Sequence, residues 1–275
     1  MRLATVRYEG QTHAARLADD HVDLLAAGDV GALLAAPGGL EAARSASPAA
    51  QVPNDAVRTE TLIPRPAKVM CIGLNYVSHI EESGAATPEY PTVFAKYARA
   101  LIGDGDDIML PSISTKVDWE VELVVVIGRE VRNAEASEAA EAIGGFTVGN
   151  DVSARDLQMR TPQWLQGKTC ESTTPVGPCM TTTDVTGVDP DLAISCAVDG
   201  VTRQSSRTSD LLFKPVELVA YLSHIVTLDP GDLIFTGTPG GVGQSLVPPV
   251  FLQDGQTVTT TIEAIGTLVN RCRAT

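Results

Sequence analysis

The stretch VDWEVELVVVIG, residues 117–128, combines a strongly apolar strand pattern with acidic residues at alternate positions. Side chains alternate between the two faces of a strand, so Asp118, Glu120 and Glu122 are predicted to point the same way. Three like charges on one face repel one another. They must therefore either face open water or be compensated by a cation.

A second apolar strand ends at another carboxylate, in the stretch FTVGNDVSARDLQ, residues 146–158. Asp151 lies where this strand gives way to a loop, and loops on a rigid scaffold commonly carry function. Together Glu120, Glu122 and Asp151 would offer three oxygen ligands to Mg²⁺ or Mn²⁺ and leave room for waters and substrate oxygens. The alternatives are a solvated acidic face for the two glutamates and a turn or helix-capping role for Asp151.

A lysine follows in the polar, turn-rich stretch QWLQGKTCESTTPVGP, residues 163–178. Lys168 would offset the charge of the three nearby carboxylates and can hold an anionic substrate. An ordinary surface lysine is the alternative, because lysine side chains are mostly exposed.

The stretch CIGLNYVSHIEESG, residues 71–84, predicts a strand followed by a short helix from Asn75 to Gly84. Within this helix His79 and Glu82 are three residues apart and share a face. A carboxylate beside an imidazole orients the ring and raises its pKa, so the pair can activate a water molecule. A solvated histidine at a helix end is the alternative.

A glycine-rich segment, DPGDLIFTGTPGGVG at residues 229–243, predicts a strand followed by backbone N–H groups that converge on an anion. A phosphate-binding P-loop is disfavoured because its lysine is missing: Gln244 follows Gly243. We expect a carboxylate-binding loop that uses Thr238, or else a tight connection whose glycines adopt positive φ.

The composition fits a globular protein and limits its partners. The chain has 275 residues, of which 44% are hydrophobic, and a formal net charge of −14. That charge disfavours nucleic acid and anionic membranes and favours a cation. With no run of 18 apolar residues and no apolar N-terminal leader, we expect a cytoplasmic protein without membrane segments. The five cysteines form no C-x-x-C pair, which is typical of reduced thiols.

The chain divides into a small N-terminal unit, residues 1–62, and a catalytic domain, residues 63–275. Two short strands flank Glu9-Gly10 in the first unit, and SASPAAQVPNDAVR, residues 45–58, is typical of a linker. The remainder is rich in short strands, with an Asp-Gly hairpin signal at residues 197–202. We predict a β-rich α+β fold.

Several motifs occur in one order along the chain: GLNYxxHxxE, DWExEL, GNDVSARD, GK, SDLLF and GDLIFTGTPGGVG. Together they resemble the fumarylacetoacetate hydrolase family over about residues 65–270. The resemblance implies a fumarylacetoacetate hydrolase-type mixed β fold with a small N-terminal β domain. It also implies a bound Mg²⁺ or Mn²⁺, a homodimer, and a small-molecule 2-oxo acid or 1,3-dicarbonyl substrate.

The resemblance assigns roles to the residues that match the family's motifs. These are metal ligands at Glu120, Glu122 and Asp151, a water-activating pair at His79 and Glu82, and contacts to substrate oxygens at Gln158, Lys168 and Thr238. The sequence departs from the family after Lys168, where KTCEST lacks the usual aromatic residues, and at Tyr97 and Arg99, where many members have Pro and Ser. Arg99 is a candidate partner for a distal substrate carboxylate, or else a surface residue. These departures concern the substrate and not the metal.

From this resemblance we expect a hydrolase that cleaves a C–C bond in an acylpyruvate-like 2,4-dioxo acid. His79, oriented by Glu82, would deprotonate a water that attacks the distal carbonyl, and Lys168 would help to stabilise the oxyanion. The alternative is a decarboxylase of oxaloacetate type, or an isomerase or hydratase of a 2-oxo acid, that uses the same metal chemistry. A metal-binding scaffold without catalysis is a further hypothesis.

Overall fold

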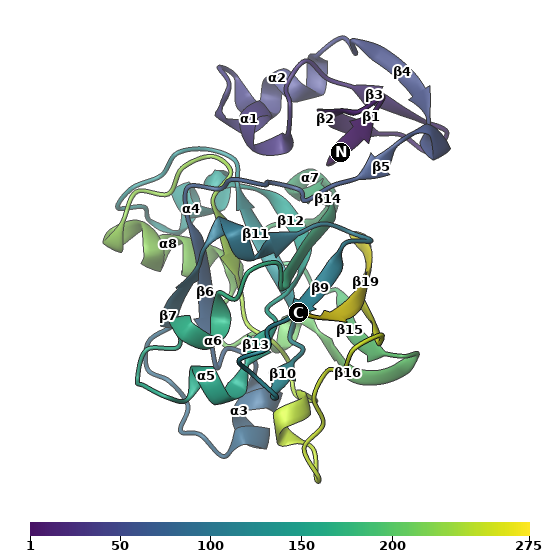
Figure 1. The fold of residues 1–275 in the computed structure, drawn as a ribbon. Helices are drawn as coiled ribbons and strands as arrows, with labels where there is room; N and C mark the ends of the chain where they lie inside the picture. Colours follow the sequence, from purple (N-terminus) through teal and green to yellow (C-terminus); the bar gives the residue numbers. More distant parts are fainter.

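A computed structural model describes residues 1–275 and contains three β-sheets with short helices around them (Figure 1). The largest sheet follows the spatial order β4 (Ala50–Pro53), β3 (His21–Leu24), β2 (Gln11–Leu17), β1 (Arg2–Tyr8), β14 (Thr174–Thr182), β12 (Ile143–Asn150), β11 (Val121–Ile127), β17 (Leu233–Phe235), β6 (Val69–Gly73) and β7 (Thr92–Lys96). Two strands join it off this path: β5 (Arg58–Thr59) on β1 and β8 (Leu101–Ile102) on β14. The predicted β-rich α+β fold is confirmed.

A second sheet and a short ribbon complete the β structure. The second sheet has the order β16 (Val201–Arg207), β15 (Ala193–Val198), β18 (Thr257–Ile262), β19 (Gly266–Ala274) and β9 (Asp107–Leu110). The ribbon pairs β10 (Val117–Asp118) with β13 (Ser153–Ala154). Asp199 and Gly200 join β15 to β16 with φ of 50° and 76°, as the Asp-Gly signal predicts.

The helices are short and lie between strands. They are α1 (Val30–Ala35), α2 (Gly39–Ser45), α3 (Val77–Ser83), α4 (Ala136–Ala142), α5 (Arg155–Gln158), α6 (Leu165–Lys168), α7 (Thr183–Thr186) and α8 (Pro215–Ile225), with 3₁₀ turns η1 (Asn54–Ala56), η2 (Ala98–Ala100), η3 (Thr208–Asp210) and η4 (Gly243–Ser245). No helix has the length and apolar character needed to cross a membrane. In Figure 1, α3, α5 and α6 lie together at the end of the molecule remote from the N-terminal strands.

Strand β11 is buried on both faces, which explains why its sequence is apolar without interruption after Glu122. Leu123 and Val125 pack in an apolar cluster shared with the second sheet. Val124 and Val126 face the opposite way and pack in a separate cluster. Because Glu122 shares the face of Val124, its carboxylate is carried into the interior of the molecule rather than to its surface.

The N-terminal unit, residues 1–62, continues the large sheet. Leu3 of β1 pairs with Met180 of β14 and packs in the same apolar cluster as Val126. The stretch that we expected to be a linker, residues 45–58, instead contains β4 and η1 and runs into β5. That prediction was wrong because an edge strand needs few apolar residues, and β4 has a single buried side chain.

Gly167 lies where α6 packs against the preceding α5 segment. A Cβ at this position would lie 2.4 Å from the Gln158 backbone N and 2.5 Å from the Ala154 O. We predict that Gly167→Ala lowers the free energy of unfolding by about 1–3 kcal/mol, because backbone atoms must shift to admit the methyl group. Gly28→Ala is the control, since nothing lies within 4 Å of its added Cβ. Urea unfolding tests both variants, and equal stability of the two would contradict the packing described.

Candidate metal centre

The acidic segment is not one continuous strand. Strand β10 ends at Asp118 and pairs with β13, whereas β11 begins at Val121 and pairs with β12. The prediction of an unbroken strand is therefore wrong at Trp119 and Glu120, where the chain changes partner. Trp119 is fully buried in the apolar core.

Glu120, Glu122 and Asp151 come together, with ligand oxygens within 4.8 Å of one another. Backbone pairing brings them there: the Asp151 N–H donates to the Glu120 carbonyl at 2.8 Å, and the Glu120 N–H donates to Asn150 Oδ1 at 2.9 Å. The exposed fractions of Glu120, Glu122 and Asp151 are 5%, 1% and 0%. This burial excludes the solvated acidic face that sequence reasoning left open.

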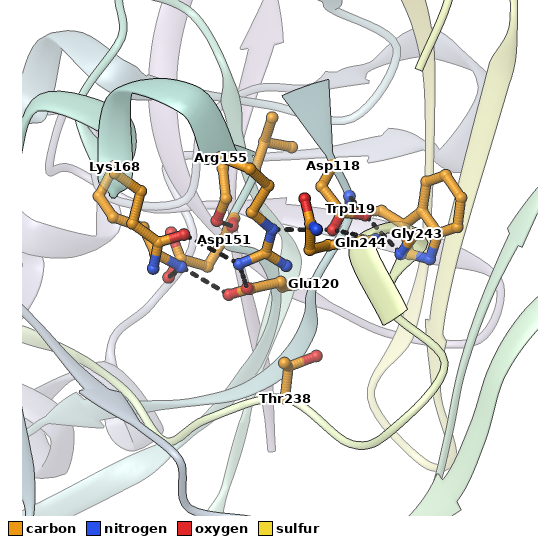
Figure 2. Close-up of polar contacts among 12 residues, drawn as sticks. Asp118, Trp119, Glu120, Asp151, Arg155, Lys168, Thr238, Gly243 and Gln244 are labelled. Carbon is orange, nitrogen blue, oxygen red and sulfur yellow. Dashed lines mark hydrogen bonds and ion pairs between the residues drawn. The ribbon is translucent and has the colours of Figure 1, made fainter. Parts of the chain in front are cut away.

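Three buried or nearly buried cations neutralise two of these carboxylates, and Figure 2 shows two of the three, Lys168 and Arg155. Lys168 Nζ lies 2.6 Å from Glu120 Oε2 and 2.8 Å from Asp151 Oδ2. Arg155 Nη1 lies 2.6 Å from Glu120 Oε1, and Lys96 Nζ is paired with Asp151 Oδ1. Burial alone would raise the pKa of Glu120, but Lys168 and Arg155 outweigh it and hold that pKa at about 2. Lys168 is therefore not a surface lysine.

Glu122 is the member of the triad without a cation within ion-pair distance. Its Oε2 accepts the Gly237 N–H at 2.7 Å. Burial raises the pKa of Glu122 well above its usual range, and the neighbouring Asp151 and Glu120 raise it further. A divalent cation held by these three residues would supply the missing positive charge. Three buried carboxylates form the hard oxygen donor set that such ions prefer, so the residues present fit the metal.

The glycine-rich loop that follows β17 was expected to bind a carboxylate ligand, but its N–H groups donate to carboxylates of the protein itself. Four N–H groups donate at 2.7–3.0 Å: Gly237 to Glu122, Gly241 to Glu82, and Gly243 and Gln244 to Asp118. Gly237 and Gly241 adopt φ of 104° and 96°, a region that strongly favours glycine. The loop therefore fixes the acidic side chains of the site.

Thr238 lines the pocket beside the triad, but its hydroxyl is engaged within the protein. Its Oγ1 donates to the Val121 carbonyl at 2.9 Å and accepts from Gln204 Nε2 at 2.8 Å. Gln204 also accepts the Val121 N–H at 3.0 Å. Thr238 thus clamps the start of β11 to the loop, and its proton is not available to donate to a substrate oxygen.

Glu120 and Glu122 line a pocket of about 520 Å³. Phe94 and Trp164 form an aromatic part of its wall, with ring centroids 5.4 Å apart in an edge-to-face arrangement. Gln158 also lines the pocket, and its Oε1 accepts from Arg155 Nη1 at 3.1 Å. The Gln158 Nε2 group is left to donate to a ligand.

The predicted pair His79 and Glu82 is present on α3, with His79 Nδ1 3.1 Å from Glu82 Oε2. The helix begins at Val77, two residues later than expected, and ends at Ser83, with Gly84 as its C-cap at φ of 66°. His79 lines the pocket. Because Glu82 also accepts the Gly241 N–H at 3.0 Å, its carboxylate is held from two sides and orients the imidazole.

Arg99 is not brought to the site. It is exposed and paired with Glu171, and it does not line the pocket. Sequence reasoning missed Lys96 and Gln204, which are both buried and both touch the segments that form the triad. The only signal for Lys96 was a lysine at the end of an apolar strand, and Gln204 gave none.

We predict that Glu120→Gln weakens Mg²⁺ or Mn²⁺ binding at least tenfold, because one charged ligand is lost. Isothermal titration of the purified protein with each metal measures the effect. Glu171→Gln is the matched control, since Glu171 is an exposed glutamate that is paired with Arg99 outside the pocket. Equal metal affinity of the two variants would contradict the assignment of the triad.

Metal affinity should rise with pH. The pKa of Glu122 is raised in the metal-free protein, so Glu122 stays protonated at pH values where a glutamate is normally ionised. It must release this proton to bind a cation. Titrations in buffers of different ionisation enthalpy, repeated from mildly acidic to mildly alkaline pH, count the protons released per ion. We expect the number of protons released per ion to decline as pH rises. Metal binding without any proton release at acidic pH would refute a raised pKa of Glu122.

The chain is similar to known proteins over most of its length. The family model for the fumarylacetoacetate (FAA) hydrolase C-terminal domain matches residues 68–273. The Rattus norvegicus protein named oxaloacetate tautomerase Fahd2a, mitochondrial, is 44% identical over 221 residues, which cover 80% of this chain and 71% of the rat protein.

Solved structures are similar over most or all of the chain. The 5-carboxymethyl-2-hydroxymuconate delta-isomerase of Mycobacterium smegmatis is 36% identical with a TM-score of 0.82, covering 100% of this chain and 99% of that one. The fumarylpyruvate hydrolase of Pseudomonas aeruginosa, in complex with Mn²⁺ and pyruvate, is 34% identical with a TM-score of 0.70. The match covers 76% of this chain and 90% of that one. The chain belongs to the fumarylacetoacetate hydrolase family.

Proposed function

We propose that the protein is a divalent-metal-dependent enzyme that interconverts the keto and enol forms of an oxaloacetate-like 2-oxo acid. The observation that carries this proposal is that Glu120 and Glu122 of the acidic triad and His79 of the His79–Glu82 pair line one pocket. Similarity to proteins named oxaloacetate tautomerase supports this reaction over the other reactions expected from the family. The C–C hydrolysis expected from the sequence becomes the second candidate.

The polar groups of the pocket would hold a 2-oxo acid by its carboxylate and its 2-oxo oxygen. A divalent cation bound by the triad would polarise the 2-oxo group and stabilise the negative charge that develops there as the enol forms. Gln158 Nε2 would donate to a substrate oxygen, because its Oε1 already accepts from Arg155. Lys168 donates to two carboxylates, so one of its three N–H bonds remains for the substrate.

His79 would move the proton. Its Nδ1 is turned toward Glu82, so the neutral imidazole presents Nε2 as the acceptor. The C3–H bond of the keto form breaks, the proton passes to Nε2, and the electron pair moves toward the 2-oxo oxygen. Transfer of this proton from Nε2 to that oxygen would give the enol, and its return to C3 would give the keto form. Glu82 would stabilise the imidazolium formed in between.

Hydrolysis of an acylpyruvate is the second candidate, and the size of the pocket favours it. About 520 Å³ with an aromatic wall of Phe94 and Trp164 is more room than a four-carbon acid needs. In this reaction His79 would deprotonate a water molecule instead of carbon C3. The similarity to a fumarylpyruvate hydrolase supports this chemistry.

We predict that His79→Gln lowers the rate of oxaloacetate tautomerisation by roughly 10²- to 10⁴-fold, the usual contribution of a general base. Metal affinity should be unchanged, because His79 is not one of the residues that would hold the ion. Decay of the enol ultraviolet absorbance, with metal or with a chelator, measures the rate. His224→Gln, an exposed histidine late in α8, is the control. Full activity of His79→Gln would exclude His79 as the base.

A substrate panel distinguishes the two candidates. Metal-dependent loss of enol absorbance from oxaloacetate, without release of pyruvate, is the result expected for a tautomerase. Metal-dependent release of pyruvate from acetylpyruvate or fumarylpyruvate would establish the hydrolase instead. Release of pyruvate and CO₂ from oxaloacetate would identify a decarboxylase.

A further inference from the structure

Lys116 lines the same pocket as Arg155, from the neighbouring strand of the β10–β13 ribbon. In this antiparallel ribbon Val117 pairs with Ala154, so the next pair along the ladder is Lys116 with Arg155. The Arg155 N–H donates to the Lys116 carbonyl at 2.9 Å, which continues the ladder to that pair. Residues directly opposite one another point to the same face. Two cations are thus placed side by side at the pocket wall.

The two cations differ in whether a carboxylate of the protein pairs with them. The Arg155 guanidinium is paired with Asp118 and with Glu120. Lys116 has no carboxylate within ion-pair distance, and its ammonium donates no hydrogen bond to the protein. The Arg155 Nη2 atom is buried and also has no partner. Like charges directly opposite in a ribbon repel one another, so this part of the wall is prepared for an anion.

Asp156, the acidic residue next to Arg155 in the sequence, does not neutralise the Lys116 ammonium. Asp156 follows Arg155 and also lines the pocket, but its carboxylate accepts from Ser114 Oγ at 2.6 Å and from the Leu157 N–H at 3.0 Å. Ser114 Oγ in turn accepts the Lys116 N–H at 3.2 Å. Asp156 therefore anchors the backbone that carries Lys116 to α5, and leaves the ammonium group free.

We propose that Lys116, together with the unpartnered Nη2 of Arg155, binds the second carboxylate of a substrate, the one that does not face the acidic triad, and that Lys116 thereby selects 2-oxo dicarboxylates over monocarboxylates. The inference rests on the proposed function for the orientation of the substrate, with its 2-oxo acid end at the triad. The exposed position of Lys116 places this contact at the rim of the pocket, where a flexible lysine can close on the second carboxylate.

Binding of two stable 2-hydroxy acids to the metal-loaded protein tests the proposal without turnover. Malate carries the second carboxylate, and lactate lacks it. Lys116→Met should weaken malate binding about threefold to tenfold and leave lactate binding within about twofold, as expected for a partly exposed ion pair. Lys116→Arg should restore most of the malate affinity because it keeps the charge.

Arg160→Met controls for a general change in surface charge. Arg160 is an exposed cation just after α5 that makes no ion pair and does not line the pocket. Malate affinity should be unchanged in this variant. Unchanged malate affinity in Lys116→Met, or equal losses for malate and lactate, would overturn the proposal.

Kinetics separate this inference from the proposed function. In an active enzyme, Lys116→Met should raise KM for oxaloacetate with kcat nearly unchanged, because the contact is made equally before and during the proton transfer. A selective loss of malate affinity in a protein that turns over no oxaloacetate would support the role of Lys116 and refute the tautomerase. A normal KM for oxaloacetate in Lys116→Met would refute the role of Lys116 and leave the tautomerase intact.

Discussion

The structure depends on how a cluster of buried charges is balanced. Four carboxylates lie together with almost no exposure: Asp118, Glu120, Glu122 and Asp151. Three cations contact them: Lys96, Arg155 and Lys168. An uncompensated buried carboxylate costs several kcal/mol, so the excess negative charge must be protonated or matched by another cation. A bound divalent ion would reverse the balance to one net positive charge, which would favour an anionic substrate.

The fold brings these charged residues together from segments that are far apart in the sequence. Pairing of β11 with β12 places Glu120 beside Asp151, and burial of β11 on both faces carries Glu122 into the interior. The loop after β17 then fixes the remaining carboxylates through its backbone N–H groups, including Glu82 of the proton-transfer pair. The acidic triad, the His79–Glu82 pair and the loop form one hydrogen-bonded unit, so displacement of any of them disturbs the others.

Local patterns made much of the site predictable from the sequence. Glu120 and Glu122 are two residues apart and His79 and Glu82 are three apart, so strand and helix periodicity predict that each pair shares a face, although Glu120 itself lies just before β11. Asp151 was predictable because it ends an apolar strand. The interruption of the strand at Trp119 was not, because it arises from a change of pairing partner between β10 and β11.

The rest of the site depends on contacts between residues far apart in the chain. Lys96 reaches Asp151 across 55 positions, and Gln204 reaches Val121 across 83. No local period marks either residue, since its partner is defined only when the sheets assemble. Thr238 shows the reverse case: the glycine-rich loop was correctly located, but hydrogen bonds within the fold occupy the hydroxyl proton expected for the substrate.

The most direct measurement is a crystal structure of the protein soaked with Mn²⁺, with data collected for the anomalous signal of manganese. We expect one strong anomalous peak at ligand distance from oxygens of Glu120, Glu122 and Asp151, with Lys168 still beside Glu120. A fully soaked crystal without a peak between these carboxylates, or with its only peak elsewhere, would contradict the metal centre on which the proposed chemistry depends.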